Sequence, residues 1–191
     1  EREVHGLVAL MELQASRLKA RVGPRGEPVL LLKQDRGRWD HMQIRRGLMA
    51  LQKGEALAGA EPGPYLLQAA IAACHARART GDETDWARIA AIYGRLGALA
   101  PSPVVELNRA VAVAMAEGPA AGLAIADAIA GEPALKDYHL LPSVRGDLLA
   151  KLGRFEEAGA EFARAAALTR NERERALLME RAEAAARGEV A

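Results

Sequence analysis

The segment LAKLGRFEEAGAEFARAAALTRN (residues 149–171) constrains the fold most, because its small and aromatic residues recur at fixed helical intervals. The positions that carry this spacing are Gly153, Phe155, Ala158, Phe162 and Ala165. Glycine and alanine let two helix axes approach closely, and each aromatic ring fills the space beneath the next helix pair. The spacing therefore predicts pairs of helices that stack on one another, with Phe155 and Phe162 in the core.

The same pattern recurs upstream at intervals of about 34 residues. Gly118 stands where Gly153 does, Trp86 and Ala120 stand where Phe155 does, and Tyr93 stands where Phe162 does. This pattern resembles the tetratricopeptide (TPR) repeat, a helix–turn–helix unit. It predicts three repeats, at residues 70–103, 104–138 and 139–172, of which the middle one is degenerate.

The rest of the chain also favours helix. Aromatic residues make up 4% of the sequence while alanine and leucine dominate, and no segment has a convincing strand pattern. We predict an all-α fold, a right-handed superhelical array of antiparallel helix pairs with about nine helices. Residues 1–62 would form N-terminal helices with an irregular segment at 23–39, residues 63–172 three TPR-like pairs, and residues 173–191 a capping helix. All of these would form a single continuous structural unit.

Two details are expected in the N-terminal part. A helix is predicted from Val4 to Gly23, with its apolar stripe facing inward: Leu7, Leu10, Met11, Leu13 and Leu18. Asp40 would cap the next helix, and Trp39, just before it, would pack back onto the first helices.

Charge is distributed unevenly along the chain. The net charge is +1, yet residues 13–54 hold ten Lys or Arg, including Arg25, against Glu27, Asp35 and Asp40, which gives +7 (10 − 3). A net charge near zero excludes a chain that binds nucleic acid by electrostatics along its whole length. The basic segment is either a solvated set of helix faces or a docking surface, for which the candidates are Arg36, Arg38, Arg45 and Arg46.

Nothing in the sequence favours catalysis. Cys74 and His75 are neighbours on a predicted helix and point about 100° apart, so they cannot act as a nucleophile–base pair. The histidines are dispersed without metal-ligand spacing, and no phosphate-binding glycine loop is present. We expect no enzyme activity, no cofactor and no metal. No apolar run reaches membrane-spanning length, and a single cysteine fits the cytoplasm.

Several polar residues interrupt the apolar stripes of the predicted helices. They are Gln68, His75, Asn108, Arg109, His139 and Arg145. If the first helix of each pair lines a concave groove, these side chains are candidates for gripping a peptide. The alternative is that Asn108 bonds a nearby turn and the arginines face water.

Segments spread over nearly the whole chain resemble one known family. They include EVHGLVALMELQASRLKAR, GPYLLQAAIAACHARA, LAPSPVVELNRAVAVAMAEGPAAGL and DYHLLPSVRGDLLAKLGR. Together they are similar to the C-terminal TPR-like extension of a group of bacterial extracytoplasmic-function (ECF) RNA polymerase sigma factors. The chain begins at Glu1 without a methionine, and we expect a piece of a longer protein.

The resemblance implies a regulatory role in transcription initiation. The promoter-reading domains of the family lie before this region, so the piece itself would not recognise promoters. Its implied partners are those sigma domains in cis, RNA polymerase and a small protein with a DGPF motif, with no membrane contact. Two alternatives remain open: a free-standing TPR adaptor for peptides, and a small-molecule sensor domain.

Overall fold

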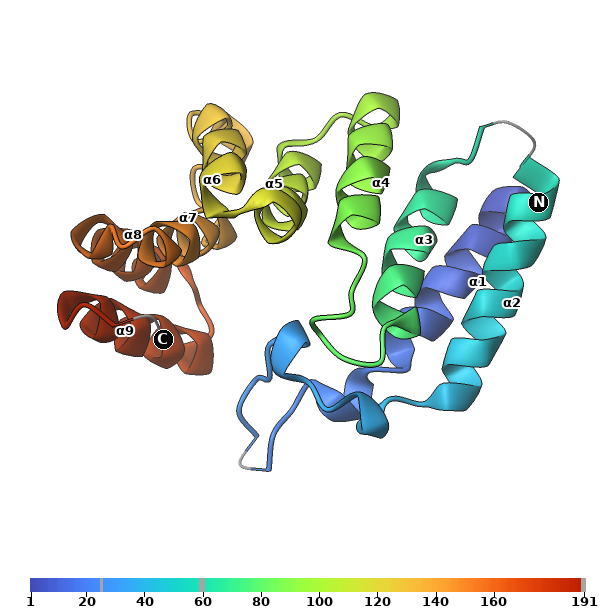
Figure 1. The fold of residues 1–191 in the computed structure, drawn as a ribbon, viewed down its shortest axis with the longest axis horizontal. Helices are drawn as coiled ribbons and strands as arrows, with labels where there is room; N and C mark the ends of the chain where they lie inside the picture. The colour runs from blue at the N-terminus through green and yellow to red at the C-terminus, as the bar shows by residue number, and fades with distance from the viewer. Residues whose placement is uncertain (25, 59–60, 190–191) are drawn as a thin grey trace. The chain divides into compact units, whose positions relative to one another are not determined.

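The computed structural model describes residues 1–24, 26–58 and 61–189. Within them the chain forms nine α-helices, coloured along the chain in Figure 1. The helices are α1 (Arg2–Ala15), α2 (His41–Ala58), α3 (Pro64–Arg77), α4 (Trp86–Leu99), α5 (Pro103–Glu117), α6 (Pro119–Ala128), α7 (Leu140–Lys151), α8 (Phe155–Leu168) and α9 (Glu172–Ala186). The described residues contain no strand, and consecutive helices pack on one another from α1 to α4 and from α5 to α9. The prediction of an all-α helical array is confirmed.

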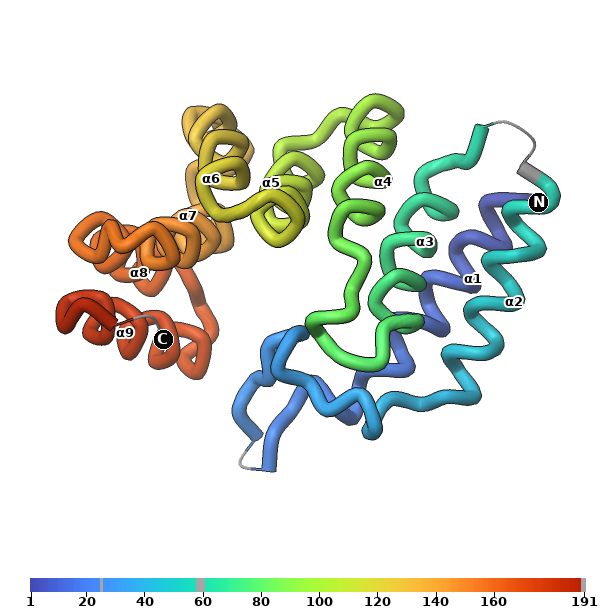
Figure 2. Tube along the Cα trace, in the orientation of Figure 1, coloured from blue at the N-terminus to red at the C-terminus, as the bar shows by residue number. Residues whose placement is uncertain are grey.

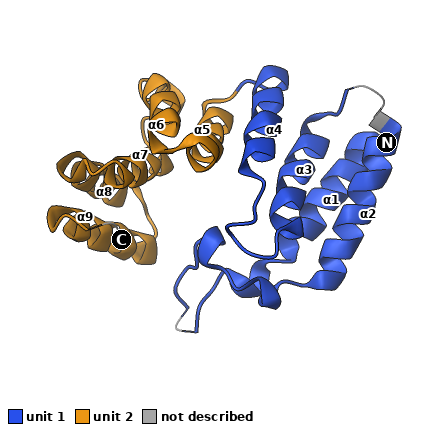
Figure 3. Ribbon diagram, viewed as in Figure 1, with its two compact units in different colours: residues 1–101 blue, residues 102–191 orange. Residues whose placement is uncertain are grey.

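The chain divides into two compact units, Glu1–Pro101 and Ser102–Ala191, which Figure 3 colours separately. Unit 1 holds α1 to α4, and unit 2 holds α5 to α9. The single continuous unit with boundaries at 62 and 172 stays a prediction. Arg25, one of the basic residues counted above, lies outside the described residues.

In unit 1, α1 packs against both α2 and α3, as the tube in Figure 2 makes visible. The close approach depends on small residues. A Cβ added at Gly6 would lie 2.7 Å from the backbone nitrogen of Leu66, and one added at Gly47 would lie 2.7 Å from the Leu13 side chain. The buried face of α1 therefore runs through Gly6, Ala9 and Leu13.

The prediction that the apolar stripe of the first helix faces inward was wrong for three of its five residues. Leu7, Met11 and Leu18 are exposed, and only Leu13 of the five is fully buried. Large apolar side chains were expected inside, but closely spaced helix axes favour Gly and Ala at the contact. This leaves an apolar strip on the outside of α1, to which Val4 and Val8 also belong.

The first helix also ends earlier than predicted, at Ala15 instead of Gly23. The buried hydroxyl of Ser16 donates to the carbonyl of Leu13, and the carbonyl of Ser16 accepts from the backbone of Asp40. A serine bonded to its own backbone in this way weakens helix continuation. The segment that follows carries an isolated bridge between Val22 and Pro28.

Trp39 lies at the end of that segment and is 3% exposed, in one cluster with Ala9, Leu13 and Ala20. The prediction that it packs back onto the first helices is confirmed. The Asp40 carboxylate accepts from the backbone nitrogens of Met42 and Gln43 and caps α2.

Unit 2 follows the repeat pattern. α5 pairs with α6, α7 with α8, and α8 with α9. Gly118 and Gly153 occupy the inter-helix turns with φ of 108° and 74°, a conformation that favours glycine. A Cβ on Gly146 would meet the Phe162 ring at 2.8 Å, so the small residue and the ring fit each other. Phe155, expected in the core, is only half-buried because it opens α8.

No helix within the described ranges is both long enough and apolar enough to cross a membrane.

Candidate functional site

Two arginines that form no ion pair among the described residues, Arg17 and Arg36, lie beside Trp39 in unit 1. The guanidinium carbons of Arg36 and Arg17 lie 4.6 and 5.7 Å from its ring centroid. Arg36 also donates to the carbonyls of His75 and Ala78, the latter at 3.3 Å, which ties the irregular segment to the end of α3. Cation–π contact and carbonyl oxygens thus hold Arg36 without a counter-ion among the residues that the structure describes.

Beside this cluster is a cavity of about 200 Å³ that lies wholly within unit 1. It is lined by Leu10 and Gln14 of α1, Arg17 just after α1, Gln68, Ile71, Ala72 and His75 of α3, Leu31, and Tyr93 of α4. The structure therefore brings Gln68 and His75, two of the six residues named for a groove, to one cavity. A pocket with apolar walls and a few polar groups is the usual form of a small-molecule site.

His75 is a buried titratable group of this site with a strongly lowered pKa. It is 8% exposed, and its ring meets that of Trp86 edge-on with 5.2 Å between centroids. Burial, and then the charges of Arg17 and Arg36, lower the pKa of His75 to about 4. The ring is neutral at pH 7, and its Nδ1 is buried without a hydrogen-bond partner.

The groove candidates of unit 2 have intramolecular partners. Arg109 donates to Glu106, one turn earlier, at 2.7 and 3.0 Å. Arg145 pairs with Asp127 and with Glu161, the latter at 3.2 Å. Asn108 is exposed. Since Gln68 and His75 belong to the other unit, a single groove formed by all six residues stays a prediction.

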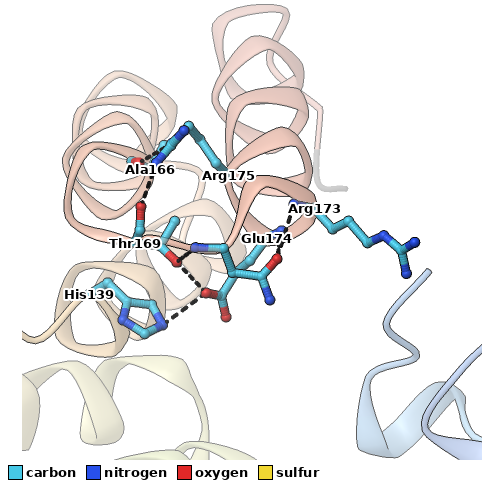
Figure 4. A network of polar contacts seen from close by, with 7 residues as sticks. His139, Ala166, Thr169, Arg173, Glu174 and Arg175 are labelled. Carbon is cyan, nitrogen blue, oxygen red and sulfur yellow. Dashed lines mark hydrogen bonds and ion pairs between the residues drawn. The ribbon is translucent and has the colours of Figure 1, made fainter. Parts of the chain in front are cut away.

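His139 takes part in the polar network that joins α7 to α9, drawn in Figure 4. Its Nε2 lies 3.2 Å from Glu174, which also accepts from the Thr169 hydroxyl. Arg175 donates to the carbonyls of Thr169 and Ala166. These bonds satisfy polar groups at the connection between α8 and α9. They also give His139 a partner within the fold.

The basic docking candidates separate into inner and outer residues. Arg36 is turned inward, as described, whereas Arg38 and Arg45 are exposed. Arg46 is exposed too, and its guanidinium forms two bonds with Glu12. Arg38 borders an open hollow of about 560 Å³ with Lys19 and Asp40. Whether these residues dock a partner stays a prediction.

Neither metal nor thiol chemistry gains support. No group of three His, Cys, Asp or Glu that could hold a metal ion occurs among the residues the structure describes. Cys74 is buried, and burial raises the pKa of its thiol, so it is a poor nucleophile at neutral pH.

Sequence reasoning missed Gln14 and Arg17, and it missed the inward role of Arg36. A signal was available, because Leu10, Gln14, Arg17 and Arg21 are three or four residues apart and share one helical face. Its basic residues were instead interpreted either as solvated helix faces or as a docking surface, because the helix prediction rested on apolar spacing.

Comparison with known proteins gives two matches. Residues 1–55 match a family model described as "Family of unknown function (DUF6596)". The chain is 47% identical over 178 residues to "Uncharacterized protein R00370" of Rhizobium meliloti (strain 1021). This alignment covers 93% of the chain but only 41% of the relative, so the chain spans about two fifths of that protein's length. No solved structure matches the chain.

Proposed function

We propose that this chain is the non-catalytic regulatory domain of a bacterial ECF sigma factor and modulates transcription initiation through contacts with the sigma domains and RNA polymerase. The observation that carries the proposal is the alignment with the Rhizobium meliloti protein. Nearly the whole chain aligns, yet it accounts for 41% of that protein. The chain therefore resembles one part of a larger protein, and from the family resemblance of its sequence we expect promoter-reading domains in the rest of its own full-length protein.

The exposed strip of α1 is the surface we assign to the sigma domains. Val4 and Met11 are each 63% exposed and Val8 is 44% exposed, on one face of a helix whose other faces contact α2 and α3. Exposed apolar residues in a continuous strip mark interaction surfaces. The strip lies within residues 1–55, the segment that the family model matches.

The first experiment deletes the coding region of this chain from its full-length gene and measures transcription from a promoter that the intact factor uses. A loss or a deregulated rise of transcription supports the proposal. Unchanged transcription contradicts it, as does a full-length reading frame without sigma domains, which favours the free-standing adaptor.

A point variant separates docking from folding. Met11→Glu places a charge on the exposed strip and leaves the buried face of α1 intact, so it should weaken binding to the sigma domains without lowering stability. Met179→Glu, at an exposed position of α9, is the matched control. Equal binding by both variants and the parent would show that the strip is not the contact. Pulldowns repeated at raised salt identify contacts that rest on charge alone.

A further inference from the structure

The positive charge at the cavity of unit 1 is not explained by a role in stabilising the fold. Among the described residues, Arg17, Arg21 and Arg36 form no ion pair, and no described acidic residue lines the cavity. Partly buried charges in proteins are usually paired, because removing them from water is costly. Here the cations face one another instead.

Arg17 is the member of this set that lines the cavity. It donates to the side-chain oxygen of Gln14, and Arg21 donates to the same oxygen at 2.9 Å. Burial, and then the charges of Arg21 and Arg36, lower the pKa of Arg17 to about 10. A neutral amide oxygen thus accepts hydrogen bonds from two guanidinium groups. A carboxylate oxygen would be the stronger acceptor for the same donors.

His75 is a second, independent indication of a missing partner. Its side chain is more than nine-tenths buried, lines the same cavity, and keeps Nδ1 without a hydrogen bond. Buried polar atoms in native proteins are nearly always bonded, so an orphan beside a cavity points to a ligand or solvent position. Gln68 adds an amide, which can donate or accept, to the same wall.

The remaining walls are apolar or aromatic, including Leu10, Ile71 and Tyr93. The volume of about 200 Å³ equals roughly seven water molecules, which is small for a nucleotide or a drug-sized ligand. The occupant should therefore combine one anionic group with a short apolar body.

From these contacts we infer that unit 1 binds a small organic carboxylate, with its carboxylate on Arg17 and its apolar body between α1, α3 and α4. The cavity gives the small-molecule sensor, one of the alternatives raised by the sequence, a concrete site. The inference does not rest on the proposed role in transcription. Binding is measured on the chain alone, so it can succeed or fail independently of any effect on a sigma factor.

Both tryptophans of the chain report on this site. Trp39 lies against Arg17 and Arg36, and Trp86 lies against His75. Intrinsic fluorescence of the 191-residue chain, titrated with sodium hexanoate or sodium benzoate, should change saturably at millimolar or lower concentration. The melting temperature should rise with the same dependence, because the ligand binds the folded state. Hexanamide and benzamide match the acids in shape without the charge, and sodium phosphate supplies charge without the apolar body.

Three variants assign the binding to the cavity. Arg17→Gln should weaken hexanoate binding by about tenfold or more, as loss of a charged hydrogen bond does. Ala72→Phe should fill the cavity and abolish binding without removing any charge, so it decides the matter if Arg17→Gln does not fold. Arg45→Gln, at an exposed position of α2, should bind like the parent.

Four results would overturn the inference. They are no saturable response to either acid, equal binding of acids and amides, binding of phosphate without preference for an apolar body, and equal weakening by Arg45→Gln and Arg17→Gln. Retained binding in Ala72→Phe would likewise place the site elsewhere.

Discussion

The two units differ in whether an arginine that lies over an aromatic ring also forms an ion pair. In unit 2, Arg181 lies 4.4 Å from the ring centroid of Phe162 and pairs with Asp147, whose other oxygen accepts from Lys151 at 2.7 Å. In unit 1, Arg36 lies over Trp39 in the same manner, yet it forms no ion pair among the described residues. The same arginine-on-aromatic contact is thus neutralised in one unit and left cationic in the other.

This difference indicates that unit 2 is a scaffold and that unit 1 holds the binding site. In unit 2, Arg145 and Arg181 are paired with carboxylates, which leaves these cations little to gain from a ligand. In unit 1, cations beside the cavity have no ion pair among the described residues. Binding of an anion there would therefore be favourable.

Removing the central ring of each unit should unfold that unit. We expect Phe162→Ala to lower the free energy of unfolding of unit 2 by about 3–5 kcal/mol, and Trp39→Ala to do the same for unit 1. Hydrogen exchange should show faster exchange within the unit that carries the change. If either variant lost protection from hydrogen exchange in both units, the expectation that each unit unfolds separately would be wrong.

Acidification should destabilise unit 1 through His75. Its folded pKa of about 4 lies below the ordinary value of 6.5, so the unfolded chain binds the proton more readily between these values. Stability is therefore full above pH 6.5 and falls by about 3 kcal/mol as the pH approaches 4. Urea unfolding followed by tryptophan fluorescence measures it, since both tryptophans lie in unit 1. A His75→Gln variant corrects for carboxylates that also titrate, and an identical pH profile in that variant would exclude His75 as the cause.

Equivalent arginine deletions should differ between the units. Arg145→Met leaves Glu161, whose side chain is 14% exposed, without its closer cation and should cost about 2 kcal/mol. Arg17→Met removes repulsion with Arg21 and Arg36, and should cost less. Chemical unfolding of both variants compares them, with the half-exposed Arg164→Met as control. A larger cost at Arg17 would show that it is paired in solution.

The smallest effect is expected at Arg109. Its pair with Glu106 spans one helical turn, and both side chains are 31% exposed. Arg109→Ala should change stability by about 0.5 kcal/mol or less, as exposed helix pairs do. A thermal melt measures it. A loss above about 1 kcal/mol would mean that this pair is more than a surface contact.

The sequence predicted the repeat of unit 2 better than the packing of unit 1. Gly146, Gly153 and Phe162 are recognisable because each has a steric role that few other residues can fill. The face of α1 was misjudged because burial in unit 1 follows small residues such as Gly6 and Ala9, which carry no hydrophobic signal.

The site was predicted only in part. Gln68 and His75 were singled out as polar residues within apolar helices, and both line the cavity. Arg17 and Arg36 looked like ordinary members of a basic segment. Their inward direction depends on Trp39 and on carbonyls of α3, contacts between residues far apart in the chain. Trp86 and Tyr93, aligned with Phe155 and Phe162 in the first predicted repeat, border His75 and the cavity.

Hydrogen exchange of the whole chain with and without sodium benzoate tests the central contrast most directly. We expect slower exchange in α1 and α3 on binding, with α5 to α9 unchanged, because Arg17, which lines the cavity of unit 1, forms no ion pair among the described residues. Protection confined to unit 2, or spread equally over both units, would contradict it.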